Sequence, residues 1–240
     1  MFPWKVLVKK LSNTLIITGY KNGLTTALFD EKSAVDLFYQ ENKDGMLVGD
    51  ICIGKVQKVV KNLAAAFIDL PFGQTGYYPL NQNQSPVYTK KGASKDIQQG
   101  DELLVQISRD SVKTKAVTLS AELTVTGSFA VVIPNGRGIS VSAKLDRDTA
   151  RTLKEKVLSY AGSEHISLDR AGMILRTNAA GVSDEELFRE ISSLLKEAVR
   201  ILSRAQYRTF GSVLYRRPRF YIGNIQNLRD RSTLIKTDLR

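Results

Sequence analysis

The chain has 240 residues, of which 42% are hydrophobic and 25% are charged, a balance typical of a soluble globular protein with one large domain or two small ones. Its 35 lysines and arginines exceed its 24 aspartates and glutamates, so the net charge is +11. An excess of this size favours a polyanionic partner such as nucleic acid, and improved solubility is the plainer alternative.

Cysteine and histidine each occur once, as Cys52 and His165. A disulfide within the chain is therefore excluded, and a structural zinc site, which needs four such ligands, nearly so. Neither residue has a nucleophile signature around it. A single thiol suits a reducing cytoplasm, and no apolar run approaches the roughly 20 residues that a membrane span requires, so we expect no membrane partner.

Residues 1–45 alternate in the manner of β-structure, with short strands expected at residues 6–8, 15–17 and 24–29. From Gly49 onward, further short strands joined by turns are expected at residues 50–60, 63–70, 76–80, 102–108 and 116–123. This run of short strands predicts a small closed barrel of the OB-fold type over residues 46–122, with residues 81–99 as a polar loop.

Helices are expected only beyond the barrel, after a strand at residues 129–133. The first spans residues 146–160, and the second spans residues 183–204 with a capping box of Ser183 and Glu186. Strands then return at residues 213–217, 220–225 and 233–237. The whole pattern predicts an α+β protein.

Two aromatic residues, Phe67 and Tyr77, fall on the second and third strands of the expected barrel, which form the binding face of an OB-fold. Alternation along a strand allows both rings to point outward, where the bases of single-stranded RNA could stack on them. Lys55, Lys58 and Lys61 precede them and could reach phosphates. The alternative is that Phe67 belongs to the core, and the pattern alone does not decide between the two.

Two motifs in this region, Ala65-Ala66-Phe67-Ile68-Asp69 and Gly76-Tyr77-Tyr78-Pro79-Leu80, resemble signatures of the ribonuclease E/G family of bacterial endoribonucleases. Further landmarks of that family follow in the same order along nearly the whole chain: Leu104-Val105-Gln106-Ile107, Lys115, Thr118-Leu119-Ser120, Gly127-Ser128, Pro134-Asn135, Gly138-Ile139-Ser140 and Arg176-Thr177.

The resemblance implies an OB-fold barrel inserted in a partial RNase-H-like subdomain and followed by a mixed α/β subdomain that senses the 5′ end of RNA. The four parts would be residues 1–45, the first RNase-H-like part; residues 46–122, an S1-type OB-fold; residues 123–212, the 5′-sensor-like subdomain; and residues 213–240, the start of the second RNase-H-like part.

The resemblance also implies roles for individual residues. Phe67 and Tyr77 would stack on bases, with Lys115 and Lys55 beside them as RNA contacts. A 5′-monophosphate would bind to a pocket formed by Arg176, Thr177, Gly127 and Val131. Where relatives carry basic residues after Gly-Ile-Ser, this chain has Val141 and Ser142, which weakens the pocket.

Family members cut RNA with a further domain that holds magnesium through two aspartates, and we expect that domain to follow the point where this sequence ends. No catalytic residue, metal ligand or cofactor is therefore expected within residues 1–240, which leaves the chain's own enzyme activity uncertain. The favoured function is binding of single-stranded RNA as part of an endoribonuclease for RNA processing or decay. The alternatives are a free-standing RNA-binding protein that never cuts and a protein-binding module. Sequence does not give the oligomeric state.

Overall fold

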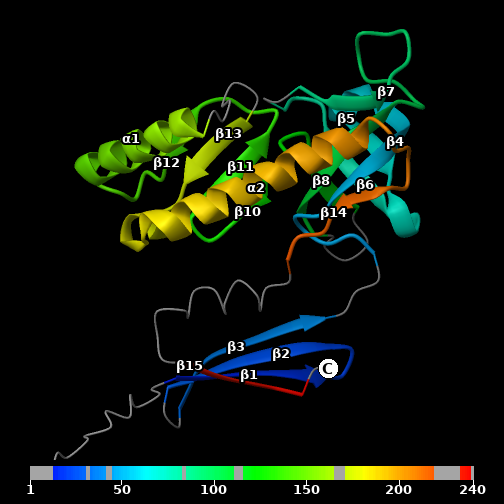
Figure 1. Cartoon of the computed structure of the whole chain (residues 1–240). Coiled ribbons are helices and arrows are strands. Elements are labelled where there is room, and N and C mark those ends of the chain that lie inside the picture. Colours follow the sequence, from blue (N-terminus) through cyan, green and yellow to red (C-terminus); the bar gives the residue numbers. More distant parts are fainter. Residues whose placement is uncertain are drawn as a thin grey trace, which may run out of the picture. The chain divides into compact units, whose positions relative to one another are not determined.

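A computed structural model describes residues 13–30, 33–41, 45–82, 85–110, 116–164, 171–218 and 233–238. The chain divides into two compact units, of which unit 1 comprises residues 1–43 and 218–240, and unit 2 comprises residues 44–217 (Figure 1). Unit 1 is therefore built from the two ends of the chain, with unit 2 inserted between them.

Unit 1 contains a four-stranded sheet in the order β15-β1-β2-β3. Its strands are β1 (Asn13–Tyr20), β2 (Gly23–Asp30), β3 (Ser33–Glu41) and β15 (Thr233–Thr237). β15 pairs in parallel with β1, so Asn13 lies opposite Thr233 although the whole of unit 2 separates them in sequence. β1, β2 and β15 lie where strands were expected, β3 was not predicted, and the strands expected at residues 6–8 and 220–225 lie outside the described residues.

Unit 2 begins with a closed barrel of five strands in the order β4-β5-β6-β9-β8, closed by pairing of β8 with β4. The strands are β4 (Ile51–Val60), β5 (Ala65–Asp69), β6 (Thr75–Pro79), β8 (Glu102–Arg109) and β9 (Val117–Ser120). One-turn 3₁₀ helices at Lys61–Leu63 and Pro71–Gly73 make the turns on either side of β5. β6 and β9 pair in parallel, and the arrangement is consistent with an OB-fold.

Alternation of apolar and polar residues accounts for this barrel. Inward-pointing side chains on every strand form its core, among them Val56, Ile68, Tyr78, Leu103 and Leu119. Two short strands extend the sheet beyond the ring: β7 (Val87–Lys90) pairs with β8, and β14 (Val213–Tyr215) pairs with β4. β7 lies within the segment that the sequence predicted to be a loop.

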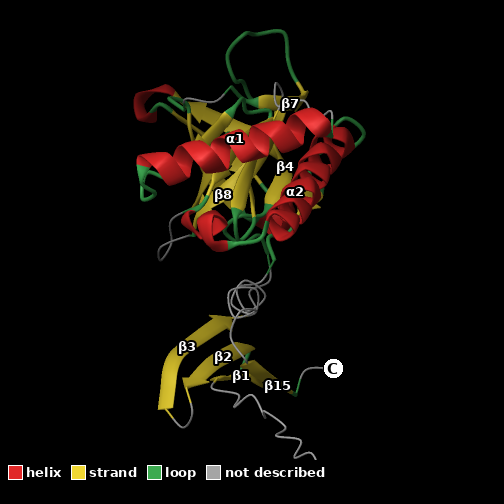
Figure 2. Ribbon diagram, turned by 60° about the vertical axis from the view of Figure 1, so that its left-hand side comes forward, coloured by secondary structure: helices red, strands yellow, loops and turns green. Residues whose placement is uncertain are grey.

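The rest of unit 2 is a second sheet with two helices. Its strands, in the order β10-β11-β13-β12, are β10 (Val125–Thr126), β11 (Ala130–Pro134), β13 (Ala171–Leu175) and β12 (Ile139–Val141). Helices α1 (Arg147–Ser163) and α2 (Asp184–Ala205) cover one face of this sheet (Figure 2), and a 3₁₀ turn at Thr177–Gly181 leads from β13 to α2. Asp146 and Ser183 cap the two helices, and the Ser183 hydroxyl accepts the Glu186 N–H at 3.3 Å.

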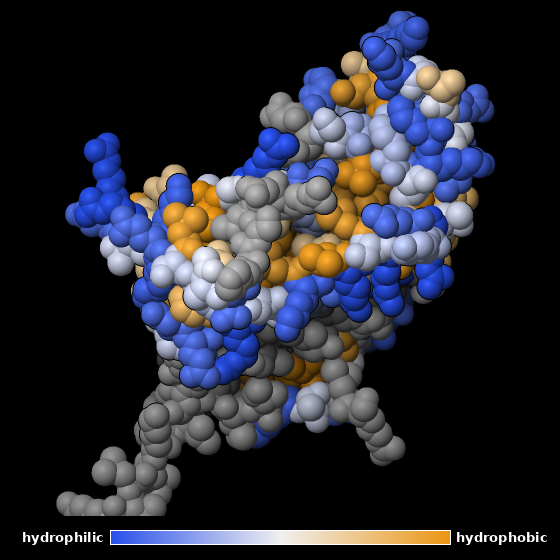
Figure 3. Space-filling model, turned by 45° about the horizontal axis from the view of Figure 1, so that its top comes forward, coloured by the Kyte–Doolittle hydropathy of each residue, from blue (hydrophilic) through white to orange (hydrophobic). Residues whose placement is uncertain are grey.

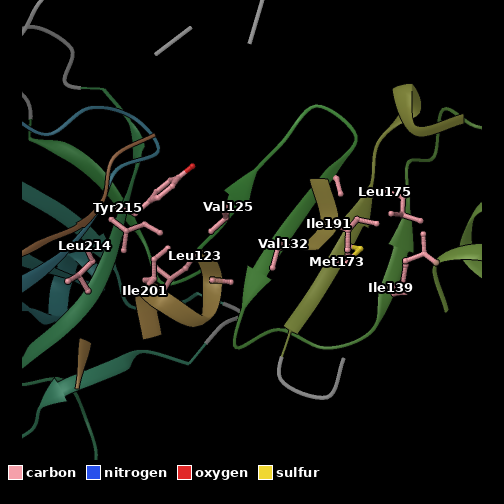
Figure 4. Close-up of a cluster of buried hydrophobic side chains, with 14 of the residues drawn as sticks. Leu123, Val125, Val132, Ile139, Met173, Leu175, Ile191, Ile201, Leu214 and Tyr215 are labelled. Carbon is pink, nitrogen blue, oxygen red and sulfur yellow. The ribbon is translucent and has the colours of Figure 1, made fainter. Parts of the chain in front are cut away.

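One hydrophobic core connects the barrel with the second sheet. Ile51, Ile53 and Leu104, on β4 and β8, belong to the same buried cluster as Ile191 and Ile201 on α2. Figure 4 shows this cluster running from Leu214 and Tyr215 through Leu123 and Val125 to Met173, Leu175 and Ile139. Because this core is shared, the barrel and the helical part form one unit in the contact pattern.

The structure confirms the α+β class, with a closed five-stranded barrel and two helices. The second segment of unit 1 begins at Pro218, after β14, which is hydrogen-bonded to the barrel strand β4. Within the part of the chain that the structure describes, no helix is long and apolar enough to cross a membrane.

Candidate nucleic-acid interface

A row of side chains crosses the outer face of the barrel from β4 to β8. Strand register places Lys58 opposite Phe67, Phe67 opposite Tyr77, Tyr77 opposite Thr118, and Thr118 opposite Arg109. Directly paired residues point to the same side of a sheet, so two aromatic rings and a hydroxyl lie between a lysine and an arginine. We call these residues, Lys58, Phe67, Tyr77, Thr118 and Arg109, the ring row.

The two aromatic rings of the row touch edge to face. The ring centroids of Phe67 and Tyr77 lie 6.1 Å apart at an interplanar angle of 73°, and Lys58 Nζ lies 5.1 Å from the Phe67 centroid. Both rings are half-buried, whereas the neighbouring Tyr78 points inward and is 1% exposed. Phe67 therefore is an outer-face residue and not part of the core, as the outward reading of the sequence had it.

Lys55 lies on the same face as the ring row but in a different setting. It is exposed, and it is paired across β4 with Asp69 on one side and Glu102 on the other. Carboxylates on both neighbouring strands offset its charge, so Lys58 is the lysine of β4 better placed to meet a phosphate beside the rings. Lys115, the other expected RNA contact, lies outside the described residues.

Two members of the ring row, Lys58 and Arg109, were not singled out as RNA-binding residues from the sequence. Lys58 was grouped with other lysines of its strand, because the irregularity between Val56 and Lys58 that sets it opposite Phe67 is not visible in the pattern. Arg109 enters the row only through the register of β8 against β9. The only sequence signal for Arg109 was that a basic residue stands at the end of a strand expected to border the binding face.

A second group of expected residues lies at the end of β13. The Arg176 guanidinium donates from Nη1 to the Gly127 carbonyl oxygen at 2.6 Å, and the Thr177 hydroxyl lies 3.2 Å from that of Ser142. Val131 is opposite Ile174 in the β11–β13 ladder, beside this strand end. The structure thus brings the four residues expected to form the 5′-phosphate pocket, Arg176, Thr177, Gly127 and Val131, to one edge of the second sheet.

A carboxylate from α2 occupies the turn next to this edge. Glu190 accepts hydrogen bonds from the backbone N–H groups of Ser128, Phe129 and Ala130 at 2.9, 2.7 and 3.0 Å. A side chain at Gly127 would collide with the same carboxylate, which explains why glycine stands there. Sequence reasoning did not find Glu190, since it is one acidic residue among several on a surface helix. The only available signal was its position one residue before the apolar Ile191.

The edge holds few side-chain cations. The Ser142 hydroxyl accepts a hydrogen bond from the Lys144 backbone N–H at 3.4 Å. Lys144 is therefore the nearest further cation along the chain, and it is exposed. Among the described residues, Arg176 is the one guanidinium that is hydrogen-bonded to Gly127, and the Glu190 carboxylate lies in the neighbouring turn.

The described residues contain no group of three or more histidine, cysteine, aspartate or glutamate side chains that could hold a metal ion. The single thiol, Cys52, is buried on β4, where burial and the nearby Asp50 carboxylate raise its pKa to about 12, partly opposed by Arg216. A thiol in this state is a core side chain and not a nucleophile. The chemistry that the described surface offers is recognition by rings, hydroxyls and cations.

Figure 3 shows hydrophilic side chains over most of one face, with apolar side chains gathered between them. A closed barrel whose outer face carries paired rings beside cations has the features of an OB-fold nucleic-acid-binding protein. Comparison with known proteins narrows this class.

The model of the Ribonuclease E/G family matches residues 124–237. Ribonuclease G of Salmonella typhimurium (strain SL1344) is 24% identical over 182 residues, covering 70% of this chain and 36% of the relative. Ribonuclease E of Haemophilus influenzae is 28% identical over 206 residues, covering 82% of this chain and 22% of the relative. Ribonuclease E of Buchnera aphidicola subsp. Schizaphis graminum is 28% identical over 194 residues, 78% of this chain and 20% of the relative.

The match to the family model and the ribonuclease G and E relatives support membership of the ribonuclease E/G family, which the sequence motifs had also indicated. This similarity supports an RNA-binding role. At 36% of the length of the ribonuclease G relative and 20–22% of the two ribonuclease E relatives, the chain spans well under half of each.

Proposed function

We propose that this chain binds single-stranded RNA through the ring row of its barrel. The observation that carries the proposal is the outward pair of Phe67 and Tyr77 with Lys58 Nζ 5.1 Å from the first ring. Stacking on an aromatic side chain contributes roughly 1–3 kcal/mol per base and accepts any base, while cations at the ends of the row attract the phosphates. Such a surface holds an extended strand without reading its sequence.

Fluorescence anisotropy with a labelled single-stranded RNA tests this proposal, provided that the affinity is measured at several salt concentrations. Binding to phosphates releases counterions, so the logarithm of the affinity should fall linearly with the logarithm of salt concentration. Lys58→Gln should reduce that slope, whereas Lys154→Gln, on the exposed side of α1, should leave it unchanged. Affinity independent of salt would contradict phosphate recognition and favour the protein-binding alternative.

We further propose that the edge near Arg176 receives the 5′ end of the RNA, in the manner that the family resemblance implies. A guanidinium, a hydroxyl and backbone N–H groups are the donors that a phosphate accepts. The Arg176–Gly127 contact at 2.6 Å supports this assignment, because it holds the guanidinium at the edge that Thr177 and Val131 share. The same proposal assigns the sheet of unit 1, which is built from both ends of the chain, to the RNase-H-like part.

The cleavage chemistry of the relatives, with its magnesium, is proposed to reside in parts of those proteins that this chain does not span. Residues 1–240 incubated with labelled single-stranded RNA and magnesium should then leave the RNA intact. Specific cuts that disappear when an aspartate of this chain is replaced by asparagine would overturn that assignment. A reducing cytoplasm is the compartment that the lone thiol favours within the proposal.

A second candidate, which the ring row supports equally, is a free-standing RNA-binding protein that never cuts. Both candidates share the ring row, so binding measurements do not separate them. Cleavage by the full protein as the cell makes it separates them directly.

A further inference from the structure

A cleft of about 330 Å³ opens on unit 2, outside the ring row. Its polar lining comes from the ends of β8 and β9, from the segment that leads into β10, and from the residues after β14: Ser108, Ser120, Glu122, Thr124, Thr126 and Arg217. The apolar part of its wall includes Ile107 and Tyr215. The volume lies near the lower end of the range for small-molecule sites, which suits one nucleotide.

The cleft continues the outer face on which the ring row lies. Thr118 of the row and Ser120 of the cleft are alternate residues of β9, so both point outward at a separation of roughly 7 Å. The Ser108 hydroxyl, on the facing strand, donates to the Thr118 carbonyl oxygen at 3.1 Å. A strand of RNA stacked on Tyr77 therefore reaches the cleft with its next nucleotides.

One wall of the cleft is held rigid by the buried amide of Gln106. Its Nε2 donates to the carbonyl oxygens of Gly49 at 2.8 Å and Thr124 at 2.9 Å, and its Oε1 accepts the Thr124 N–H at 2.8 Å. With all its hydrogen-bonding capacity used internally, Gln106 shapes the site and leaves recognition to other groups. The Ser120 hydroxyl accepts the Glu122 N–H at 3.0 Å, which leaves its own proton free to donate into the cleft.

The two charged residues of the cleft are available to a ligand. Both Glu122 and Arg217 are exposed, and among the residues that the structure describes neither side chain forms an ion pair. The position of Arg217 is fixed by its backbone N–H, which donates to Asp50 Oδ1 at 3.0 Å, and by close packing of its side chain on Gly49. A carboxylate and a guanidinium thus face the same small space.

We infer that this cleft binds the base of one nucleotide of the RNA strand and selects guanine. The Watson–Crick edge of guanine offers two adjacent N–H donors, which one carboxylate accepts together, beside a carbonyl oxygen that a hydroxyl or guanidinium satisfies. Adenine presents a bare ring nitrogen to the carboxylate, so it is disfavoured. Glu122 is the residue that selects, while Arg217 is positioned for the carbonyl oxygen or the phosphate. The inference rests on the proposed function, because the ring row delivers the strand to the cleft.

Two oligouridines of equal length, one carrying a single guanine and the other a single adenine at the same position, test the inference by competition. The guanine oligomer should bind about tenfold more tightly at its best position, as for one bidentate base contact. Glu122→Gln should abolish this preference without reducing affinity for plain oligouridine. Glu155→Gln, which removes the same charge from the exposed side of α1, should keep the preference.

A titration with guanosine, followed by the amide NMR signals of the protein, separates failure of the cleft from failure of the ring row. Signals of Ser120, Thr124 and Thr126 should shift with guanosine, but not with adenosine, and not in Glu122→Gln. Oligouridine binding that depends on Phe67 but shows no guanine preference would overturn the cleft and leave the proposed function standing. If no RNA binds, the proposed function fails, and the guanosine titration alone then tests whether the cleft binds guanine. Signal shifts outside the cleft, or no shifts at all, would overturn the inference.

Discussion

At the scale of single residues, the outer face of the barrel depends on which side of a strand each ring takes. Phe67 faces outward between Lys58 and Tyr77, so its removal takes away stacking surface without opening a cavity in the core. We expect Phe67→Ala to weaken binding of single-stranded RNA by about 1–3 kcal/mol in an anisotropy titration.

The control for that substitution is Phe72→Ala, because Phe72 is another exposed aromatic residue, 64% accessible, outside the ring row. It should leave the affinity nearly unchanged. Circular dichroism should show both variants folded. An unfolded Phe67→Ala chain, or full affinity per folded molecule, would contradict the assignment of this face.

The 5′ edge should discriminate only weakly between RNA ends. A 5′-monophosphate carries close to two negative charges, but this edge offers one guanidinium in contact with Gly127, and the Glu190 carboxylate already holds the neighbouring N–H groups. We expect a preference for 5′-monophosphate over 5′-hydroxyl RNA of about tenfold or less, that is, no more than ~1.4 kcal/mol, in competition between two otherwise identical oligonucleotides.

Arg176→Ala should abolish that preference while binding to the body of the RNA persists, because the ring row is untouched. Lys144→Ala tests whether the exposed lysine next to Ser142 contributes a second cation. A preference that survives Arg176→Ala would place the sensor elsewhere, and a hundredfold preference lost in Lys144→Ala would show that this lysine supplies a second cation.

Only some residues of these sites could be predicted from the sequence, for reasons that differ between residues. Alternation allowed the rings of Phe67 and Tyr77 to point outward without deciding the matter, and the family resemblance singled them out together with Arg176 and Thr177. Three other groups, Lys58, Arg109 and Glu190, depend on strand register or on the packing of a helix against a distant turn. Contacts between residues far apart in sequence leave no local pattern.

At the scale of elements, the start of α2 offers a defined test of a local signal. The Ser183 hydroxyl accepts the Glu186 N–H, which would otherwise lack a partner within the helix. Ser183→Ala should lower the free energy of unfolding by about 0.5–2 kcal/mol in urea denaturation. Ser193→Ala, at an exposed position within the same helix, should change it little or raise it slightly, since alanine is the better helix former. Equal stability of the two variants would argue against the cap.

The elements themselves followed the sequence closely where alternation or capping was strong. The five barrel strands and both helices lie within a few residues of their expected ranges, because each combines an apolar period with a turn or cap. β3, β7 and β13 were missed, as were the short strands β10 and β12, which pair with β11 and β13. β7 lies in a polar segment, and β13 is a short apolar run of Ala, Gly, Met, Ile and Leu with no alternation. Their strand state comes from pairing with β2, β8, β11 and β12.

At the scale of the whole molecule, the single cysteine reports on the integrity of unit 2. Burial and the neighbouring Asp50 carboxylate raise the pKa of Cys52 to about 12, so the folded chain holds it as a protonated thiol at pH 8. A thiol-specific reagent should therefore react slowly with the native protein and rapidly in urea. Rapid reaction of the native chain would show that β4 opens readily.

The raised pKa of Cys52 also determines how the stability of the folded chain changes with pH. The ordinary thiol pKa is 9.0, below the value in the folded chain, so the unfolded chain loses its proton first as the pH rises. Stability contributed by the protonated thiol is complete below pH 9 and declines from pH 9 toward about 12. Cys52→Ala should flatten this part of the stability curve, measured by urea denaturation at several pH values.

The two ends of unit 2 are tied together. Asp50, which is 1% exposed, accepts the Leu47 N–H at 3.0 Å and the Arg216 guanidinium at 2.7 Å, and that guanidinium also donates to the Gly45 carbonyl oxygen at 2.6 Å. The segments that enter and leave the unit are thus joined by one buried carboxylate. Such closely spaced ends are what a unit needs to sit within a loop of another.

This closure sets an order of folding events. β15 must pair with β1 across residues 44–217, and while those residues are unfolded the pairing closes a very long, entropically costly loop. Once the barrel and helices have formed, the Asp50–Arg216 contact leaves only short connections to span. We therefore expect the pairing of β15 with β1 to form after unit 2 has folded and to be weakened when unit 2 unfolds.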